Sequence, residues 1–196
     1  MPNLARSRTA ELLLFASNFL RHPMMLGSII PSSRFLVNQV LEPIDWERAH
    51  VIVEYGPGVG TITSEILRRM RPDAHLVAIE TNRDFVRFLQ GTLPDPRLQL
   101  VHESAAEVQS VLQRLGLPAP SYIVSGIPLG SMPEQLRADI VSKSRAALAP
   151  GGAFLVYQFT SRVYPVLQQT FQHVRRSFQP RNLPPAQLFV CATEAG

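Results

Sequence analysis

Glycine and glutamate residues with the spacing of a ligand site lie in the first half of the chain. The mostly apolar run Val51–Tyr55, which includes Glu54, leads into Gly56–Gly60, which contains three glycines, and Glu80 ends the next apolar run. Glycines let a backbone turn tightly and pass close to a ligand, and a carboxylate after the second strand accepts hydrogen bonds from ribose hydroxyls. This pattern predicts a site for a ligand that contains a nucleoside.

The position of the third glycine separates two kinds of nucleoside ligand. Dinucleotide sites place it three positions after the second glycine, where the pyrophosphate meets the helix N-terminus. Here Thr61 stands at that position, and the glycines are Gly56, Gly58 and Gly60. The spacing therefore favours a nucleoside without phosphates.

Alternating strands and helices are expected to hold this site. Strands are expected at residues 50–55, 75–80, 97–102, 121–125, 152–159, 172–180 and 186–193, and helices at 61–70, 83–90, 105–115, 133–147 and 162–170. This alternation predicts a mostly parallel sheet with helices on both faces. A short proline-rich link joins the last two strands, so the last strand is expected to be antiparallel. The fold class is therefore α/β, with a Rossmann-like seven-stranded sheet.

Extra amphipathic helices are expected before the sheet. A helical wheel of residues 4–21 places phenylalanines and leucines on one face and polar residues on the other. Such a helix either lies in a membrane interface or caps the domain, and both interpretations stay open. Ser32 or Ser33 can cap a further helix that runs to about Leu41.

Length and composition indicate one globular chain. With 196 residues, 45% of them hydrophobic, a single compact unit is sufficient, divided into cap helices over 1–45 and the α/β domain over 46–196. No run is long enough for a membrane span and the start lacks the layout of a signal peptide, which predicts a cytoplasmic protein. The single cysteine, Cys191, has no partner for a disulfide and no metal-ligand spacing around it, so no metal is expected.

Positive charge gathers at both ends of the chain. The net charge is +4, and the terminal arginines are Arg6, Arg8, Arg21, Arg34, Arg162, Arg175, Arg176 and Arg181. Basic ends on a nearly neutral body suggest an anionic partner, either phospholipid head groups or nucleic acid. A plain solvated surface is the alternative interpretation.

The glycine turn, the acidic strand end and the expected terminal hairpin together resemble the class I S-adenosylmethionine-dependent methyltransferases. Leu148–Gly152 is similar to that family's turn into its fifth strand. A narrower resemblance, to the soluble-type bacterial phospholipid N-methyltransferases, is carried by Gly27–Leu36, Glu54–Gly60, Ser125–Pro128 and Asn182–Ala186. Those enzymes methylate phosphatidylethanolamine toward phosphatidylcholine and are related to the ribosomal RNA adenine dimethyltransferases.

The resemblance implies a set of residues that hold S-adenosylmethionine. The expected set is Glu54, Gly56, Gly58, Gly60, Glu80, Thr81, Glu103, Ser104, Ala105 and Ser125. The glycine turn and Glu54 would shape the pocket for the methionine part, and Glu80 would bind the ribose. The family has an acidic residue for the adenine amino group where Ser104 stands, so either Ser104 or Glu103 takes that contact here.

The resemblance also places the acceptor. Ser125, Gly126 and Ile127 would hold the amine, and Tyr157 is a further expected catalytic residue. The lipid phosphate is expected to be bound by Arg34, Ser32, Ser33 and Arg181. Relatives that methylate adenine carry an aromatic residue where Leu129 stands, and a flipped base needs such a ring to stack on, so nucleic acid is not the expected partner.

The sequence thus predicts an enzyme that methylates the ethanolamine head group of a phospholipid. We expect it to associate peripherally with the anionic inner face of the cell membrane. Two alternatives stay open, an RNA adenine N6-dimethyltransferase and a non-catalytic membrane-surface or cofactor-sensing protein. The number of methyl groups transferred and the oligomeric state are not set by the sequence.

Overall fold

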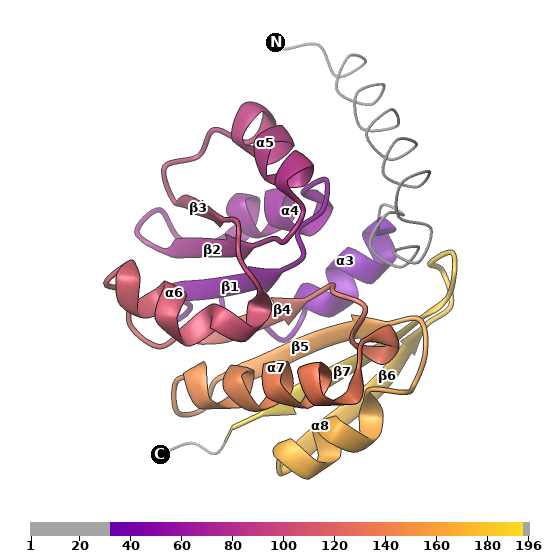
Figure 1. Ribbon diagram of the computed structural model, residues 1–196. Coiled ribbons are helices and arrows are strands. Elements are labelled where there is room, and N and C mark those ends of the chain that lie inside the picture. Colours follow the sequence, from indigo (N-terminus) through magenta and orange to yellow (C-terminus); the bar gives the residue numbers. More distant parts are fainter. Residues whose placement is uncertain (1–31, 194–196) are drawn as a thin grey trace.

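Seven strands form a single sheet in the computed structural model, which describes residues 32–193 (Figure 1). The strands are β1 (Val51–Tyr55), β2 (His75–Ile79), β3 (Leu98–Val101), β4 (Tyr122–Ser125), β5 (Ala153–Gln158), β6 (His173–Gln179) and β7 (Ala186–Ala192). Their order across the sheet is β3-β2-β1-β4-β5-β7-β6, and β7 runs antiparallel to both of its neighbours. The predicted mostly parallel sheet with an antiparallel last strand is confirmed.

Helices cover both faces of the sheet, as predicted (Figure 1). They are α3 (Arg34–Leu41), α4 (Thr61–Arg69), α5 (Arg83–Thr92), α6 (Val108–Arg114), α7 (Glu134–Ala147) and α8 (Tyr164–Thr170), with 3₁₀ turns η2 (Ala105–Glu107) and η3 (Leu129–Ser131). The helix expected over 105–115 begins as the 3₁₀ turn η2, because the Ser104 hydroxyl accepts the Ala106 N–H at 3.2 Å and holds this turn. The amphipathic helix expected over residues 4–21 lies outside the described residues.

The alternation of side chains along each strand divides the core into two layers. On β1, Val51, Val53 and Tyr55 pack with α6, α7 and α8, whereas Ile52 packs with α3 and α4. All five residues of β1 are buried, and all except Glu54 are hydrophobic, as expected of a strand covered on both faces. The same alternation sends Glu54 to the α3 and α4 face.

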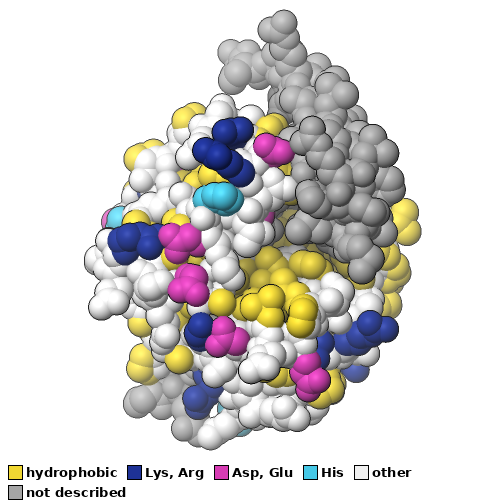
Figure 2. Space-filling view, in the orientation of Figure 1, with side chains coloured by type: hydrophobic (Ala, Val, Ile, Leu, Met, Phe, Trp, Pro, Cys, Tyr) yellow, Lys and Arg dark blue, Asp and Glu magenta, His cyan; other side chains and the backbone are white. Residues whose placement is uncertain are grey.

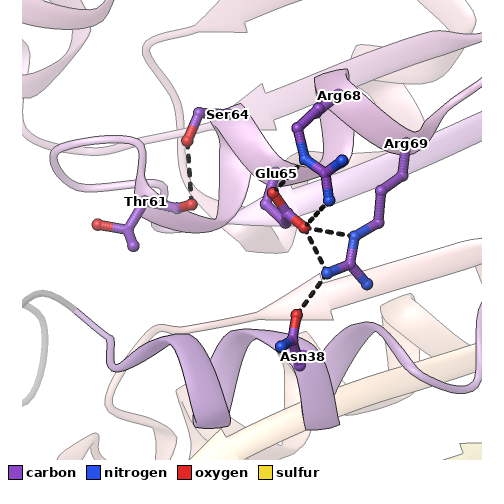
Figure 3. Close-up of polar contacts among 6 residues, drawn as sticks. All are labelled: Asn38, Thr61, Ser64, Glu65, Arg68 and Arg69. Atoms are coloured by element: carbon purple, nitrogen blue, oxygen red, sulfur yellow. Dashed lines mark hydrogen bonds and ion pairs between the residues drawn. The ribbon is translucent and has the colours of Figure 1, made fainter.

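A polar cluster fastens α3 to α4 (Figure 3). Glu65 on α4 accepts hydrogen bonds from Arg68 and Arg69, and Arg69 Nη2 also donates to Oδ1 of Asn38 on α3 at 2.5 Å. The hydrogen bond from Arg68 is the main reason that the pKa of Glu65 falls to about 2. The cluster therefore keeps its charges over the neutral pH range and fixes the position of α3.

The turn at the start of α3 lies against the β6–β7 hairpin. Ser33 caps α3 by accepting the Leu36 N–H at 3.2 Å, which selects Ser33 from the two predicted caps. The Ser33 N–H in turn donates to Oδ1 of Asn182 at 2.9 Å, and Asn182 Nδ2 donates to the carbonyl of Pro184 at 2.8 Å. Asn182 thus joins two segments that are far apart in the sequence.

Within residues 32–193, no helix is both long and apolar enough to cross a bilayer. The same part of the chain holds no group of three His, Cys, Asp or Glu side chains arranged to bind a metal ion. Cys191 is fully buried in β7, and burial raises the pKa of its thiol to about 12.

Candidate functional site

The carboxyl ends of β1 to β4 meet at one edge of the sheet and enclose a cavity of about 260 Å³. The sheet order reverses direction between β1 and β4, and ligands of open α/β sheets bind at such a point. The lining residues are Gly56, Ile79, Glu80, Thr81, Asn82, Phe85, Glu103, Ser104, Ala105, Ile127, Pro128, Met132, Leu136 and Ile140. Figure 2 shows hydrophobic side chains gathered on this face, above α7. Six of the ten predicted cofactor residues therefore line one cavity.

The glycine turn has the conformation that only glycine adopts readily. Gly56, Gly58 and Gly60 have φ angles of +69°, +56° and +85°. A Cβ atom on residue 56 would lie 2.7 Å from Cγ2 of Ile127, so the turn and the cavity wall are in close approach. A ligand in the cavity therefore meets bare backbone at Gly56.

Glu80 is a buried carboxylate that lines the cavity and holds the glycine turn. Its side chain accepts the Gly58 N–H at 3.3 Å and the Asn82 N–H at 2.8 Å, and the residue is only 6% exposed. Burial raises the pKa of Glu80, and these backbone donors oppose the rise. The carboxylate is thus pre-oriented at the cavity wall, where ribose hydroxyls would donate to it.

Glu54 is a second buried carboxylate, at the end of β1, and it is 2% exposed. Burial, together with the nearby Glu80, raises its pKa to about 8, although the Thr63 hydroxyl lies close enough to lower it somewhat. Neither Oε2 of Glu54 nor Oγ1 of Thr63 has a hydrogen-bond partner of normal geometry among residues 32–193. Buried polar atoms without partners are rare and call for an explanation.

These features fit S-adenosylmethionine. A bare glycine turn admits close approach of the ligand, Glu80 offers acceptors for a ribose, and the unpaired Glu54 oxygen suits a cationic group such as the methionine ammonium. The residues that would hold the cofactor are therefore Gly56, Glu80 and the apolar wall of the cavity, with Glu54, which is buried and does not line the cavity, as the candidate partner for the ammonium.

Both candidates for the adenine contact line the same cavity. Ser104 Oγ already accepts the Ala106 N–H, while Oε1 of Glu103 is ion-paired with Nη2 of Arg114 at 2.6 Å. Each side chain keeps an acceptor site for an amino group, Ser104 a second lone pair and Glu103 its other oxygen. The two possibilities that the sequence leaves open stay open in the structure.

A second, smaller pocket of about 150 Å³ shares Pro128 with the cofactor cavity. It is lined by Gly126, Pro128, Gly130, Ser131, Tyr157, Gln158, Phe159, Thr160 and Arg162. The 126–131 segment therefore separates the two spaces, which places the predicted acceptor residues Gly126, Ile127 and Tyr157 at their boundary.

Gln158 holds this separating segment in place. Its Nε2 donates to the Ile127 carbonyl at 2.8 Å, and its Oε1 accepts the Gly130 N–H at 3.1 Å. The Ile127 carbonyl also accepts the Leu129 N–H, whereas no hydrogen bond from residues 32–193 reaches the Gly126 carbonyl. Of these two carbonyls, the one on Gly126 is available to an acceptor amine.

Ser125 ends β4 as expected, but its side chain is fully buried and pairs in register with Tyr55 on the α7 face. Tyr157 lies on the other face, with α3 and α4. Within the described chain the Ser125 hydroxyl has no hydrogen-bond partner. A contact from Ser125 to a ligand at the cavity would therefore use its backbone.

The Tyr157 hydroxyl is buried close to Ser32 and Gly126, which are both predicted site residues. Burial, together with the Glu54 charge, raises its pKa to about 12, although the Ser32 side chain lies close enough to lower it somewhat. A hydroxyl with this pKa stays protonated at neutral pH, so Tyr157 can donate or accept a hydrogen bond but cannot serve as an ionised base.

Two predicted lipid-binding arginines come together on one aromatic ring. The guanidinium carbon of Arg34 lies 4.9 Å from the Phe35 ring centroid, and that of Arg181 lies 5.1 Å from it. Both arginines are exposed, and stacking on Phe35 keeps their charged groups close to each other. The structure thus brings together Ser32, Ser33, Arg34 and Arg181 at the start of α3.

Sequence reasoning assigned no role to Thr63, Phe35 or Asn182. A single sequence gives no signal for Thr63, because only the folded chain buries its hydroxyl near Glu54 without a hydrogen-bond partner. In the sequence Phe35 follows Arg34, and Asn182 follows Arg181. The aromatic residue next to Arg34 was the available signal for the stacking of arginines on Phe35.

Comparison with protein families and curated proteins places the chain among methyltransferases. A profile of the family "Ribosomal RNA adenine dimethylase" matches residues 15–180. The chain is 33% identical to an ornithine lipid N-methyltransferase of Singulisphaera acidiphila, over 92% of this chain and 95% of that protein. It is 26% identical to ribosomal RNA small subunit methyltransferase A of a Polaromonas species, over 67% of this chain but 44% of that protein.

Solved structures agree with the fold. The N-methyltransferase NodS of Bradyrhizobium japonicum, in complex with S-adenosylhomocysteine, superposes with a TM-score of 0.64 at 13% identity, covering 82% of this chain and 88% of that one. At this identity the similarity concerns the fold alone.

Proposed function

This chain belongs to the ribosomal RNA adenine dimethylase family of class I S-adenosylmethionine-dependent methyltransferases, and from that premise we propose that it methylates the amine of a membrane lipid. The specific acceptor that we propose is phosphatidylethanolamine, which is converted toward phosphatidylcholine. One observation carries the proposal. The paired arginines on Phe35 lie at the same edge of the sheet as the cofactor cavity, and the neighbouring Ser32 lies close to Tyr157, which lines the second pocket.

The arginine pair supports a lipid head group with an anion close to an amine. Arg34 and Arg181 have no ion pair with any carboxylate among residues 32–193. Guanidinium groups bind phosphate oxygens through two parallel hydrogen bonds, and two of them near each other favour a doubly accepting anion. In phosphatidylethanolamine the phosphate is separated from the amine by two carbons, so an anion site and an amine site are both required.

The second pocket supports an amine acceptor. Tyr157 and Phe159 present aromatic side chains there, and aromatic rings attract methylated ammonium groups through their faces. The Gly126 carbonyl lies at the boundary with the cofactor cavity and can accept a hydrogen bond from the attacking amine.

Few catalytic groups are needed for the reaction itself. S-adenosylmethionine supplies a methyl group on a sulfonium, which an amine displaces in line, so alignment of the two can provide most of the rate. An ammonium must first lose its proton. The raised pKa of Tyr157 keeps its hydroxyl protonated, so Tyr157 does not take this proton and instead orients the acceptor through a hydrogen bond.

Ornithine lipid and an RNA adenine are the two alternative acceptors. The relative from Singulisphaera acidiphila is named for ornithine lipid, which also combines an amine with an anionic group, in this case a carboxylate. An RNA adenine is favoured by the family profile, but Leu129 is fully buried in the core and offers no ring for a flipped base. The hypothesis of a lipid acceptor therefore has more support than the hypothesis of an RNA acceptor.

Radiolabelled S-adenosylmethionine tests the proposal directly. The full chain is incubated separately with phosphatidylethanolamine vesicles, ornithine lipid vesicles and ribosomal RNA, and the label is followed into each. We expect label in phosphatidylethanolamine, reduced at least tenfold in the Arg34→Gln/Arg181→Gln double variant. Arg48→Gln, at an exposed site before β1, is the matched control.

Each other outcome has a clear meaning. Label in ornithine lipid alone would keep a lipid amine as acceptor but replace the head group. Label in RNA alone would overturn the lipid proposal. Cofactor binding without label in any acceptor would support a non-catalytic sensing protein.

A further inference from the structure

The tip of the β6–β7 hairpin, residues 179–185, carries apolar side chains in the open. Leu183 is 83% exposed and Phe178, just before the tip, is 53% exposed. The structure describes only one other exposed large hydrophobic residue, Leu136, and that one lines the cofactor cavity. Exposed side chains of this size at a projecting tip are a feature of surfaces that contact another molecule.

The charge around the tip has a single sign. The hairpin from β6 to β7, residues 173–192, contains Arg175, Arg176 and Arg181 but no Asp or Glu. Arg34 and Arg181 are held beside the tip by Phe35 and make no ion pair with any described carboxylate. A cationic surface without internal counter-charges is complementary to an anionic partner.

The tip faces the same way as the cofactor cavity. Both β5 and β6 pair antiparallel with β7, so β6 ends at the edge where the parallel strands end. The bond from Ser33 to Asn182 fixes the tip against the start of α3, next to Ser32 and Tyr157. A partner that binds the tip is therefore brought near the second pocket, which Tyr157 lines.

We propose that this hairpin tip, with Arg34 and Arg181 beside it, docks the protein on the anionic surface of a lipid bilayer. Leu183 enters the boundary between head groups and acyl chains, and the arginines bind lipid phosphates. An RNA backbone would use the arginines but leave Leu183 in water, since nucleic acid binds exposed side chains by stacking on aromatic rings. The inference rests on the proposed lipid substrate and adds how the protein approaches it.

A fluorescent label at the tip tests the docking. The single natural cysteine, Cys191, is fully buried, so a Leu183→Cys variant of the full chain can be labelled selectively with an environment-sensitive dye. Arg48→Cys serves as the matched control, because Arg48 is 89% exposed and lies before β1 at the opposite edge of the sheet. Both labelled proteins are titrated with phosphatidylcholine vesicles that contain or lack phosphatidylglycerol, and with ribosomal RNA.

We expect the dye at position 183 to shift to shorter wavelength and gain intensity several-fold with phosphatidylglycerol vesicles, while the dye at position 48 does not change. Unlabelled Arg34→Gln and Arg181→Gln variants should each bind these vesicles about fivefold more weakly, the loss expected for one basic side chain near an anionic surface. Arg48→Gln should bind as the unmodified protein does.

Methyl transfer to phosphatidylethanolamine in detergent micelles is measured on the same samples, which separates the docking from the proposed function. Methyl transfer without a dye response at position 183 would overturn the docking and leave the function intact. Equal responses at positions 183 and 48 would also overturn it. A response at 183 to RNA but not to vesicles would assign the surface to nucleic acid.

Discussion

The hydroxyl of Tyr157 fills the space that a β-carbon on residue 126 would occupy. Gly126 follows β4 and Tyr157 belongs to the neighbouring strand β5, so the two residues meet at the wall between the cofactor cavity and the second pocket. Only a glycine allows the tyrosine ring to take this position, and this makes the wall sensitive to a single methyl group.

Gly126→Ala should therefore damage acceptor methylation more than cofactor binding. The added methyl displaces Tyr157, and such overpacking costs about 1–3 kcal/mol, so we expect a loss of roughly 5- to 150-fold in kcat/KM for the lipid. Affinity for S-adenosylhomocysteine, measured by calorimetry, should change by less than about threefold. Gly91→Ala is the matched control, because nothing lies within 4 Å of a β-carbon there. Equal losses in both measurements would show that the wall does not divide the two functions.

Glu80→Gln should weaken cofactor binding. The substitution keeps the shape of the side chain but removes the charge that accepts the Gly58 N–H and would accept ribose hydroxyls. Hydrogen bonds to charged groups contribute about 1.5–3 kcal/mol, which corresponds to roughly 10- to 150-fold in affinity. Calorimetry with S-adenosylhomocysteine measures this loss, and Glu42→Gln, on the exposed end of α3, should bind normally. Unchanged affinity of the Glu80 variant would remove this residue from the cofactor site.

Glu54 should make the ligand-free protein less stable as the pH rises. Its pKa is about 8 in the folded protein against 4.5 for the unperturbed group, so between these values the folded state holds more protons than the unfolded state. Stability therefore falls through this window, by a total on the order of 3–5 kcal/mol. Glu54→Gln removes the effect, and we expect a higher Tm than the unmodified protein near pH 9 but no gain near pH 4.

The same group should release a proton when the cofactor binds. A cation placed beside Glu54 lowers its pKa, so binding at pH 7 is expected to release up to one proton. Calorimetry in two buffers of different ionisation enthalpy measures this number, and the Glu54→Gln variant should release none. Identical heats in both buffers for the unmodified protein would contradict the placement of a cation at Glu54.

Asn182→Ala should separate the hairpin from α3. The Ser33 N–H loses its acceptor, which costs about 1–3 kcal/mol of stability for a partly buried donor, and Arg181 is no longer fixed near Arg34. Lipid methylation should fall several-fold while cofactor affinity is kept. Asn38→Ala removes another α3 contact, the one to Arg69, and serves as the control for a general loosening of this helix (Figure 3). If both variants lose lipid activity equally, the effect belongs to α3 as a whole.

Removal of residues 1–21 should reduce vesicle binding, because their pattern predicts an amphipathic helix of the interfacial kind. Cofactor affinity is expected to stay nearly unchanged, since the residues that line the cavity all lie in the α/β domain. Sedimentation with phosphatidylglycerol vesicles measures the first quantity and calorimetry the second. Unchanged sedimentation would assign these residues to the alternative, a cap on the domain.

Much of the fold is readable from the sequence because it follows from local patterns. The strand Val51–Tyr55 is apolar except for Glu54, the glycine turn allows one conformation, and the short link before Ala186 permits only a hairpin. These features depend on residues close together in the chain, so one sequence without relatives is sufficient to predict them.

The contacts that complete the site cannot be predicted in this way. The pairing of Ser33 with Asn182 spans 149 positions, and the unpaired oxygen of Glu54 depends on which side chains surround it after folding. Ser125 and Tyr157 were expected together near the acceptor, but strand alternation sends their side chains to opposite faces of the sheet. Such outcomes are set by tertiary packing.

The bond between Ser33 and Asn182 also has a consequence for the order in which a ribosome produces the molecule. Synthesis at about 5–20 residues per second separates these two positions by roughly 7 to 30 s, because 149 positions lie between them. The residues of strands β1 to β4 and of the cavity that they enclose have all been added to the nascent chain before Asn182. A growing chain can thus possess its nucleoside cavity while its arginine pair is still unformed.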